Sequence, residues 1–389
     1  MEIDALTSPD TFVAGVPYEL FARLRRDAPV ALTRSPEGQT FWSVTRYEDV
    51  MSASRDPKTF SSNPQPSAEN PVLINMDPPG HTRYRQLVSS GFSPRTVAAM
   101  EPGIRRRASV LIERALDRED VDFVTDVAAR LPLEVICDLM GIPAADHDLV
   151  LSWSNRLVAS DDPEYQVISE NRESAQADAF SYFVALANDR RQQPKDDLVT
   201  TLVEAEIDGG RLSELELALF CILLLIGGNE TTRNTLSHSI LLLVEHPDAR
   251  LQLSREPGLW PAAVEEMLRH SSALMQFTRR ATKETEIAGQ RIAAGDLLAL
   301  WYCSANRDEQ AYDTPDRFDV GRTAPKPAVT FGGGGPHICL GASLARLEIR
   351  LLLEELLSRA GDIVLRSPPV RLRSNFINGV KHLPLRMAR

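Results

Sequence analysis

Helical periodicity of the hydrophobic positions dominates the chain from about Pro94 to Ser358. β-like runs are shorter: one covers residues 40–44, and others fall near residues 286–301 and 363–384. No Gly/Ser-rich linker, internal repeat or abrupt change in composition divides the sequence. The pattern therefore predicts a mostly α fold with a small β region, formed by residues 1–389 as a single domain.

The longest predicted helix begins at a capping box, in which Ser213 precedes Glu216 by three residues. Its apolar pattern continues to about Val244, and Pro247 ends it, so the helix has roughly 30 residues and a length of ~45 Å. Its most apolar stretch, residues 217–228, is too short to span a bilayer. We therefore expect a long helix and no membrane span.

The segment from Phe331 to Gly341 holds four consecutive glycines followed by Cys339. A second helix is predicted at or just after this cysteine, because leucines recur at helical spacing until Gly361. Glycines let backbone N–H groups approach a ligand atom closely, and a thiolate at a helix N-terminus gains from the helix dipole. A lone thiolate with no second protein ligand indicates iron already held by a porphyrin.

The segment also allows two other interpretations. An inert buried cysteine in a Gly-rich loop is the favoured view of any single Cys, but the whole segment before a helix is far more specific. A phosphate-binding loop does not fit, because no Gly-Lys-Ser/Thr follows and the glycines are not spaced as GxGxxG. The haem-thiolate interpretation is therefore preferred.

The long helix is interrupted halfway by Gly227-Gly228-Asn229-Glu230-Thr231-Thr232. Each glycine costs about 1 kcal/mol of helix propensity relative to Ala, and an acid enters an apolar stretch. Glycines allow a flat cofactor or substrate to lie against the backbone, Thr231 can hold a water, and Glu230 can relay protons. The alternative is a helix kink with a solvated Glu and Thr.

Charged residues form two further pairs at helical spacing. Glu266 and Arg269 lie three apart on one face of a helix that opens at Trp260-Pro261. His81 and Arg85 lie four apart on the first turns of another helix, where both can point at one anion. By itself the Glu266 and Arg269 pair is also typical of a surface ion pair.

Composition narrows the class of protein. The 43 Lys and Arg against 54 Asp and Glu give a net charge of −11, which disfavours sequence-independent binding of nucleic acid or anionic lipid. The four cysteines are scattered without a CxxC pair, so neither a disulfide framework nor a zinc site is expected. The first four residues carry acids where a secretory signal carries Lys or Arg, and we expect a cytoplasmic protein.

Together these motifs resemble the cytochrome P450 family, and the resemblance extends over nearly the entire chain. It implies the P450 fold, haem b as cofactor and O₂ as co-substrate, with Cys339 as the axial iron ligand. The residues that it implies for cofactor binding are Cys339, His337, His81, Arg85, Arg279, Gly335, Gly341 and Phe331.

The match is incomplete at two places. Arg280 follows Arg279 directly and is the alternative partner of a haem propionate. The family's commonest pattern has Phe seven residues before the Cys, where this chain has Gly332, and Phe331 lies eight before it. The Cys loop therefore looks one glycine longer than usual.

The resemblance implies roles for the other motifs. Glu230 and Thr231 match the family's acid–alcohol pair, which serves oxygen activation. Glu266 and Arg269 match a buried structural ExxR pair, with Arg317 as its expected third member. The remaining histidines match no catalytic motif, and we expect them to be at the surface or locally bonded.

A hydrophobic substrate and an external electron donor are also implied. The expected substrate contacts are Leu73, Leu224, Gly227, Leu274, Met275, Phe277 and Ile377. No flavin or iron–sulfur segment is recognised, so a separate ferredoxin and ferredoxin reductase are expected as donors. Arg346, Arg350 and residues 105–107 are candidates for attracting an acidic ferredoxin.

The implied activity is monooxygenation: hydroxylation or epoxidation of a hydrophobic small molecule such as a steroid, terpenoid or fatty acyl compound. Four alternatives stay open at this point. One is a natural-product tailoring oxidase acting on a macrolide, polyketide or carrier-bound peptide, and another is a haem-thiolate enzyme that does not add oxygen. The third is a haem-binding sensor without catalysis, against which the intact Glu230-Thr231 pair argues, and the fourth is a soluble hydrolase with a Ser-His pair, which no motif supports.

Overall fold

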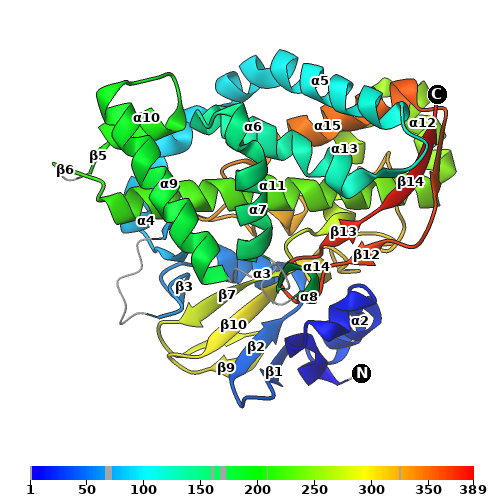
Figure 1. Ribbon diagram of the computed structural model, residues 1–389. Coiled ribbons are helices and arrows are strands. Elements are labelled where there is room, and N and C mark those ends of the chain that lie inside the picture. Colours follow the sequence, from blue (N-terminus) through cyan, green and yellow to red (C-terminus); the bar gives the residue numbers. More distant parts are fainter. Residues whose placement is uncertain (1, 66–71, 159–161, 167–171, 208, 324–325) are drawn as a thin grey trace. The chain divides into compact units, whose positions relative to one another are not determined.

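The computed structural model describes residues 2–65, 72–158, 162–166, 172–207, 209–323 and 326–389. It divides into two compact units, which are described separately. Unit 1 comprises Met1–Glu69, Asn234–Cys339 and Ile363–Leu383, and unit 2 comprises Asn70–Arg233, Leu340–Asp362 and Pro384–Arg389. The expected helix-rich class with a small β portion is confirmed (Figure 1), and the single domain stays a prediction.

Unit 1 is built on a five-stranded sheet (Figure 1). Its order is β1 (Val30–Arg34), β2 (Thr40–Val44), β10 (Leu297–Trp301), β7 (Gln276–Ala281) and β3 (Phe60–Ser61). β10 pairs parallel with β2 and antiparallel with β7. The strand predicted over residues 40–44 therefore pairs on one side with the nearby β1 and on the other with β10, more than 200 residues later in the chain.

Both faces of this sheet are covered, which follows from the sequence of β10. Leu298 and Leu300 join a core cluster with α3 (Tyr47–Arg55) and α14 (Tyr302–Ala305). Trp301, on the opposite face, joins a second cluster with Phe12 of α1 (Asp10–Val13) and Phe21 of α2 (Tyr18–Asp27). Successive residues of a strand point to opposite faces, so a strand buried on both sides is apolar throughout.

Unit 1 also contains helices and strands outside this sheet. They are η1 (Ile3–Thr7), α12 (Pro247–Arg255), η6 (Pro257–Leu259), α13 (Trp260–Ser271), the β8–β9 hairpin (Thr285–Ile287 and Gln290–Ile292), η7 (Val329–Phe331) and the β12–β13 pair (Val370–Arg371 and Val380–His382). η7 leads directly into the Cys loop.

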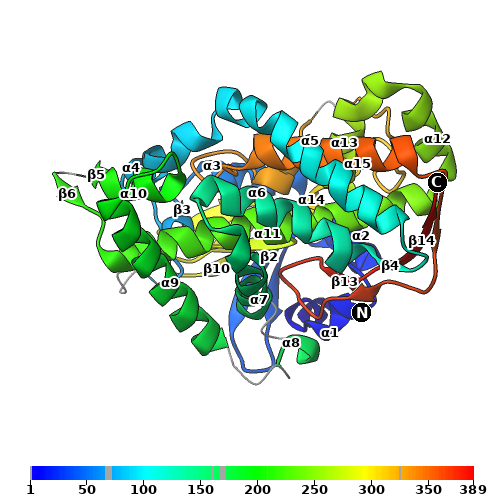
Figure 2. The same ribbon diagram turned by 45° about the horizontal axis from the view of Figure 1, so that its top comes forward.

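Unit 2 is almost entirely helical. Its helices are η2 (Leu73–Asn75), α4 (Gly80–Ser89), η3 (Ser90–Phe92), α5 (Pro94–Leu116), η4 (Val124–Ala128), α6 (Arg130–Met140), η5 (Ala144–Asp146), α7 (His147–Val158), α8 (Pro163–Gln166), α9 (Arg172–Gln192), α10 (Leu198–Glu204) and α15 (Ala342–Arg359). Short strands form the pairs β4 (Val121–Asp122) with β14 (Pro384–Ala388), and β5 (Glu206–Ile207) with β6 (Gly210–Arg211). β11 (Asp362–Leu365) begins where unit 2 passes into unit 1. α5 and α15 lie side by side (Figure 2).

The long helix is α11 (Glu214–Glu245), and its capping box is present. The Ser213 hydroxyl accepts from the Glu216 backbone N–H, and the Glu216 carboxylate accepts from the Ser213 N–H. By length and composition α11 would suffice to cross a membrane, but half of its most apolar window is buried inside the protein, as in a core helix. α15 begins at Ala342, slightly later than expected, so Cys339 lies in the turn before the helix.

Candidate active site

The loop between η7 and α15 presents one thiol. The Cys339 backbone N–H donates to the Phe331 carbonyl at 2.8 Å, which closes the loop on itself. Cys339 is exposed and forms no disulfide, whereas Cys137, Cys221 and Cys303 are buried. Burial raises the pKa of Cys137 and of Cys303 to about 12, so these thiols stay protonated. Cys339 is thus the accessible sulfur ligand among the four.

Backbone conformation and close packing, which the sequence did not reveal, require glycines in this loop. Gly332, Gly334 and Gly335 have positive φ angles of 95°, 85° and 74°, which favour glycine. A Cβ at Gly333 would lie 2.6 Å from Ser54 Oγ, and one at Gly335 would lie 2.5 Å from the Ser54 carbonyl oxygen. The loop therefore needs glycines to pack against the end of α3, whatever else it binds.

The donor set around Cys339 fits a metal that brings its other ligands with it. Within the described residues, no group of three or more His, Cys, Asp or Glu side chains is arranged to hold a metal ion. Gly341, two residues after the thiol, faces open space: a Cβ added there meets nothing within 4 Å. His337 and Phe331 are half-buried in the same loop. A thiolate in such surroundings fits iron in a porphyrin.

Arg279 adds a second observation for the fit. It is 6% exposed, and its Nη1 donates to the Thr278 carbonyl at 2.8 Å, but no carboxylate of the described residues pairs with it. Arg280 is engaged elsewhere: its guanidinium donates to the carbonyls of Pro64 and Gly295. A buried cation without a counter-ion is costly, so Arg279, rather than Arg280, fits a propionate of the cofactor.

In unit 2, the two glycines of α11 have different surroundings. A Cβ at Gly228 would lie 3.0 Å from Cγ1 of Ile136, so this glycine permits close packing of α6. A Cβ at Gly227 would meet nothing within 4 Å. The Thr231 hydroxyl, one turn later, donates to the Gly227 carbonyl at 2.9 Å, and Thr231 is half-buried. Gly227 therefore borders open space, and the Thr231 hydroxyl is bonded to its backbone.

Glu230 belongs to a buried polar cluster with α7. It is 1% exposed, forms an ion pair with Arg233, and accepts from Ser154 Oγ at 3.2 Å. Arg233 also donates to Asn155 Oδ1 at 2.7 Å, and Asn229 donates to Ser154 Oγ. Burial raises the pKa of Glu230, and the Arg233 charge opposes this shift. Successive helix residues point ~100° apart, so Glu230 and Thr231 serve different sides of α11.

His81 and Arg85 lie on the first turns of α4, as expected. His81 is buried and Arg85 is half-buried. Burial and the neighbouring Arg85 charge lower the pKa of His81, and Asp77 opposes the change. Both side chains thus place donors for an anion at one helix start in unit 2.

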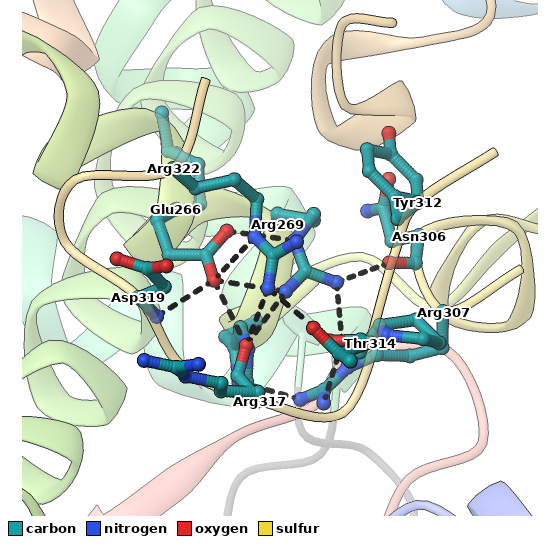
Figure 3. Close-up of polar contacts among 12 residues, drawn as sticks. Glu266, Arg269, Asn306, Arg307, Tyr312, Thr314, Arg317, Asp319 and Arg322 are labelled. Carbon is teal, nitrogen blue, oxygen red and sulfur yellow. Dashed lines mark hydrogen bonds and ion pairs between the residues drawn. The ribbon is translucent and has the colours of Figure 1, made fainter. Parts of the chain in front are cut away.

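Glu266 and Arg269 form the buried pair, but its third member is not Arg317 (Figure 3). Arg269 binds both Glu266 oxygens at 2.8 and 2.9 Å, and Arg322 Nε donates to Glu266 Oε1 at 3.0 Å. Arg317 contributes its backbone carbonyl, which accepts from Arg322 at 2.8 Å, while its side chain is exposed. The expectation for Arg317 was wrong: the third side chain on Glu266 is that of Arg322, and Arg317 contributes only a backbone carbonyl. A contact made by a carbonyl has no sequence signature.

Hydrogen bonds set the charge state of this cluster. Burial alone would raise the pKa of Glu266, but the hydrogen bonds from Arg269 and His270 outweigh it, and the pKa lies well below its usual value. Arg269 further donates to the carbonyls of Asn306 and Pro315, both at 2.7 Å. The pair therefore ties α13 to the segment that precedes the Cys loop.

The apolar candidates divide between the units. In unit 1, Leu274 and Ile377 form an isolated antiparallel β-bridge. The Phe277 ring contacts the Phe376 ring edge to face, with 5.6 Å between the ring centroids. Met275 is fully buried in the core cluster around Trp301, so its side chain packs in the core rather than lining a site. In unit 2, Leu73 is buried in η2, and Leu224 and Gly227 lie on α11.

The expected basic surface for a ferredoxin is largely neutralised. Arg105 pairs with Glu101, Glu354 and Glu355. Arg350 pairs with Glu101 and Glu354, and Arg107 with Glu134 and Asp138. Of the residues 105–107, Arg106 is exposed and has no carboxylate partner within the described residues. The ion pairs of Arg105 and Arg350 connect α5 with α15, and those of Arg107 connect α5 with α6.

Comparison with known proteins agrees with this geometry. A sequence model described as Cytochrome P450 matches residues 161–257 and 259–360. A methyl-branched lipid omega-hydroxylase of Mycobacterium tuberculosis is 43% identical over 385 residues, covering 94% of this chain and 90% of that protein. A steroid C26-monooxygenase of Rhodococcus jostii is 38% identical over 395 residues, covering 96% and 83%.

A solved structure is similar along the whole fold. It is a Mycobacterium marinum cytochrome P450, CYP268A2, in complex with pseudoionone. Its TM-score is 0.91 at 35% identity, and the match covers 97% of this chain and 96% of that one.

Proposed function

The chain belongs to the cytochrome P450 family, and on this premise we propose that it hydroxylates a lipid, steroid or terpenoid at a C–H bond of an apolar chain. It is a monooxygenase with haem b as cofactor and O₂ as co-substrate, and its relatives act on hydrophobic molecules. The observation that carries the proposal is the single exposed thiol, that of Cys339, since no group of three or more His, Cys, Asp or Glu side chains in the described residues is arranged to hold a metal ion.

When bound, haem activates O₂, so that R–H, O₂, two electrons and two protons give R–OH and water. Cys339 would hold the iron through its sulfur. Arg279 and Arg85 would offset the charge of the propionates, and His81 and His337 would donate hydrogen bonds to them, with Phe331, Gly335 and Gly341 shaping the loop against the cofactor.

The protein's own part in proton supply lies on α11. The Thr231 hydroxyl donates a hydrogen bond to the Gly227 carbonyl. Its oxygen can therefore accept a hydrogen bond from a water. Glu230 holds a buried carboxylate between Arg233 and Ser154, from which a proton can be taken up and released at Oε1 or Oε2. We assign proton delivery to these two residues jointly.

Substrate selection rests on apolar side chains. Leu274, Phe277 and Ile377 in unit 1, and Leu73, Leu224 and Gly227 in unit 2, offer no charge to a ligand. Apolar residues of this kind exclude water and orient a hydrocarbon by shape. The names of the relatives support lipids and steroids as the first classes to examine.

Electron supply by a separate ferredoxin and its reductase, in the cytoplasm, is part of the same proposal. The intramolecular pairing of Arg105, Arg107 and Arg350 implies that attraction to an acidic donor is modest. The reduction rate should therefore depend weakly on ionic strength.

The test is a substrate screen on haem-loaded protein. Branched and linear fatty acids, steroids, acyclic terpenoids and a macrolide are scored by the low-spin to high-spin shift of the Soret band. Binders are then incubated with O₂, NADPH and a surrogate ferredoxin system. We expect a lipid, steroid or terpenoid product with one added oxygen atom. Turnover of the macrolide alone, or oxidation without oxygen insertion, would overturn the proposal.

A further inference from the structure

A turn near the C-terminus, residues 374–380, is held by the second half of α11. His238 Nε2 lies 2.9 Å from the Asn378 carbonyl oxygen. A carbonyl can only accept, so the ring must donate through Nε2–H, which fixes its tautomer. Asn234, one helical turn earlier, accepts the Val380 N–H through Oδ1 at 3.0 Å. Two side chains on one face of α11 thus bind a carbonyl and an N–H group of the turn's backbone.

The opposite side of the turn is held as well. The Asn378 N–H donates to the Ala273 carbonyl at 3.0 Å, and its Nδ2 donates to the Ser271 carbonyl at 2.6 Å. Ser374 Oγ accepts the N–H groups of Phe376 and Ile377 at 3.1 and 3.0 Å. The segment is therefore hydrogen-bonded both to α11 and to the C-terminal end of α13, including Ala273 just beyond it.

The clamp positions two apolar side chains. Phe376 is 38% exposed, and its carbonyl accepts the Met275 N–H at 2.8 Å, beside its edge-to-face contact with Phe277. Ile377 is buried against Leu274. Phe277, Leu274 and Ile377 are the unit 1 residues that the proposed function places against the substrate.

We propose that His238 is a positioning residue that sets where the substrate is oxidised, by fixing the turn that carries Phe376 and Ile377. The inference rests on the proposed function and deepens it, because it names what holds one wall of the hydrocarbon site. His238 itself is 8% exposed and touches the backbone of the turn, so it acts through Phe376 and Ile377.

The bond is suited to a permanent support. Burial lowers the pKa of His238 to about 4, and the nearby Arg371 charge acts in the same direction. The ring is therefore neutral at physiological pH and keeps one donor and one acceptor. Without its donor, the buried Asn378 carbonyl would be left unpaired, which is energetically costly. The turn would therefore shift until this carbonyl reaches another donor or a water.

The experiment compares wild type with His238→Gln, whose amide can still donate to the carbonyl, and His238→Leu, which cannot. His246→Leu is the matched control, because His246 stands at the end of α11 and contacts the Phe318 ring instead. Hydrogen exchange by mass spectrometry follows the peptide covering residues 372–381. Product ratios are measured with 15-methylhexadecanoic acid, O₂, NADPH and a surrogate ferredoxin system.

We expect His238→Leu to exchange faster in this peptide and to change the ratio of terminal to internal products by about threefold or more. KM should rise more than kcat falls, whereas His238→Gln and His246→Leu should stay within about twofold of wild type. If His238→Leu does not retain haem, His238→Asn replaces it, since its amide is too short to reach the carbonyl.

An unchanged product ratio in a variant that exchanges faster would refute a role in selectivity. Unchanged exchange would refute the clamp itself. The two proposals fail separately: if wild type oxidises none of the lipids screened, the substrate class is wrong, while hydrogen exchange still decides whether His238 holds the turn.

Discussion

The Thr231 hydroxyl donates to the carbonyl of Gly227, four residues earlier in α11, at 2.9 Å. This bond uses the only hydrogen of the hydroxyl, so toward a water the Thr231 oxygen can act only as an acceptor. The neighbouring acid, Glu230, is turned toward Ser154 and Arg233 instead. The alcohol and the acid thus have separate supports.

Replacing Thr231 by Ala should uncouple reductant consumption from product formation, because no side chain would hold the water that delivers protons. NADPH oxidation should continue, with product per NADPH falling by about tenfold and hydrogen peroxide rising. Thr231→Ser keeps the hydroxyl and is the control. Fully coupled turnover in Thr231→Ala would contradict the role assigned to this residue.

Arg322 and Arg317 provide a matched pair for stability. Arg322→Ala removes a guanidinium from the buried Glu266 carboxylate and should lower the free energy of unfolding by roughly 3 kcal/mol. Arg317→Ala keeps the backbone carbonyl that the cluster uses and should cost under about 0.5 kcal/mol. Denaturant titration measures both, and equal losses would contradict the assignment of Arg322 as third member.

Arg279 and Arg280 should differ in haem retention. Arg279→Gln removes the buried cation that fits a propionate, and haem transfer to apomyoglobin should be faster by about tenfold. Arg280→Gln breaks bonds to the carbonyls of Pro64 and Gly295, so it should lower the melting temperature with little effect on haem transfer. The reverse pattern would assign the propionate to Arg280.

Two buried histidines should make folding sensitive to mild acid. Burial lowers the pKa of His238 and of His270 to about 4 each, against about 6.5 in the unfolded chain. The unfolded state then binds more protons between these values, so stability is complete above about pH 6.5 and falls as the pH drops toward 4. The slope is ~1.4 kcal/mol per pH unit for each histidine.

The control for this dependence is His238→Gln, which cannot titrate. Its loss of stability between about pH 6.5 and 5 should be smaller than that of wild type by one histidine's share, measured by denaturant titration at each pH. An identical slope would show that His238 is protonated in the folded state.

The cysteines offer a test of ligand identity. Cys339→Ser should abolish the red-shifted Soret band of the ferrous carbonyl complex, because that band requires a thiolate ligand. Cys303→Ser changes a buried thiol whose pKa is raised to about 12, and it should keep the band. Retention of the band in Cys339→Ser would remove the basis of the functional assignment.

Local signals in the sequence were sufficient for the elements that carry the chemistry. The Ser213 and Glu216 capping box placed the start of α11, and its apolar length placed the end. Cys339 after four glycines singled out the loop in which the proposed function places the iron ligand, and the three-residue spacing of Glu266 and Arg269 gave their pairing. Each of these features depends on residues a few positions apart, whose geometry a helix or turn fixes by itself.

Contacts between distant segments decided the rest. Arg322 reaches Glu266 from 56 positions away, while Arg317, favoured by its local motif, offers a carbonyl that any residue has. The loop glycines fit against Ser54, and the arginines of α5 find carboxylates on α15.

His238, which matched no catalytic motif, holds a turn 140 residues later in the chain. Such partners depend on the tertiary structure, because a buried polar group must form a hydrogen bond with a donor or acceptor that the fold places next to it. A single sequence specifies the groups and their local geometry, but the chain must be folded before their partners are defined.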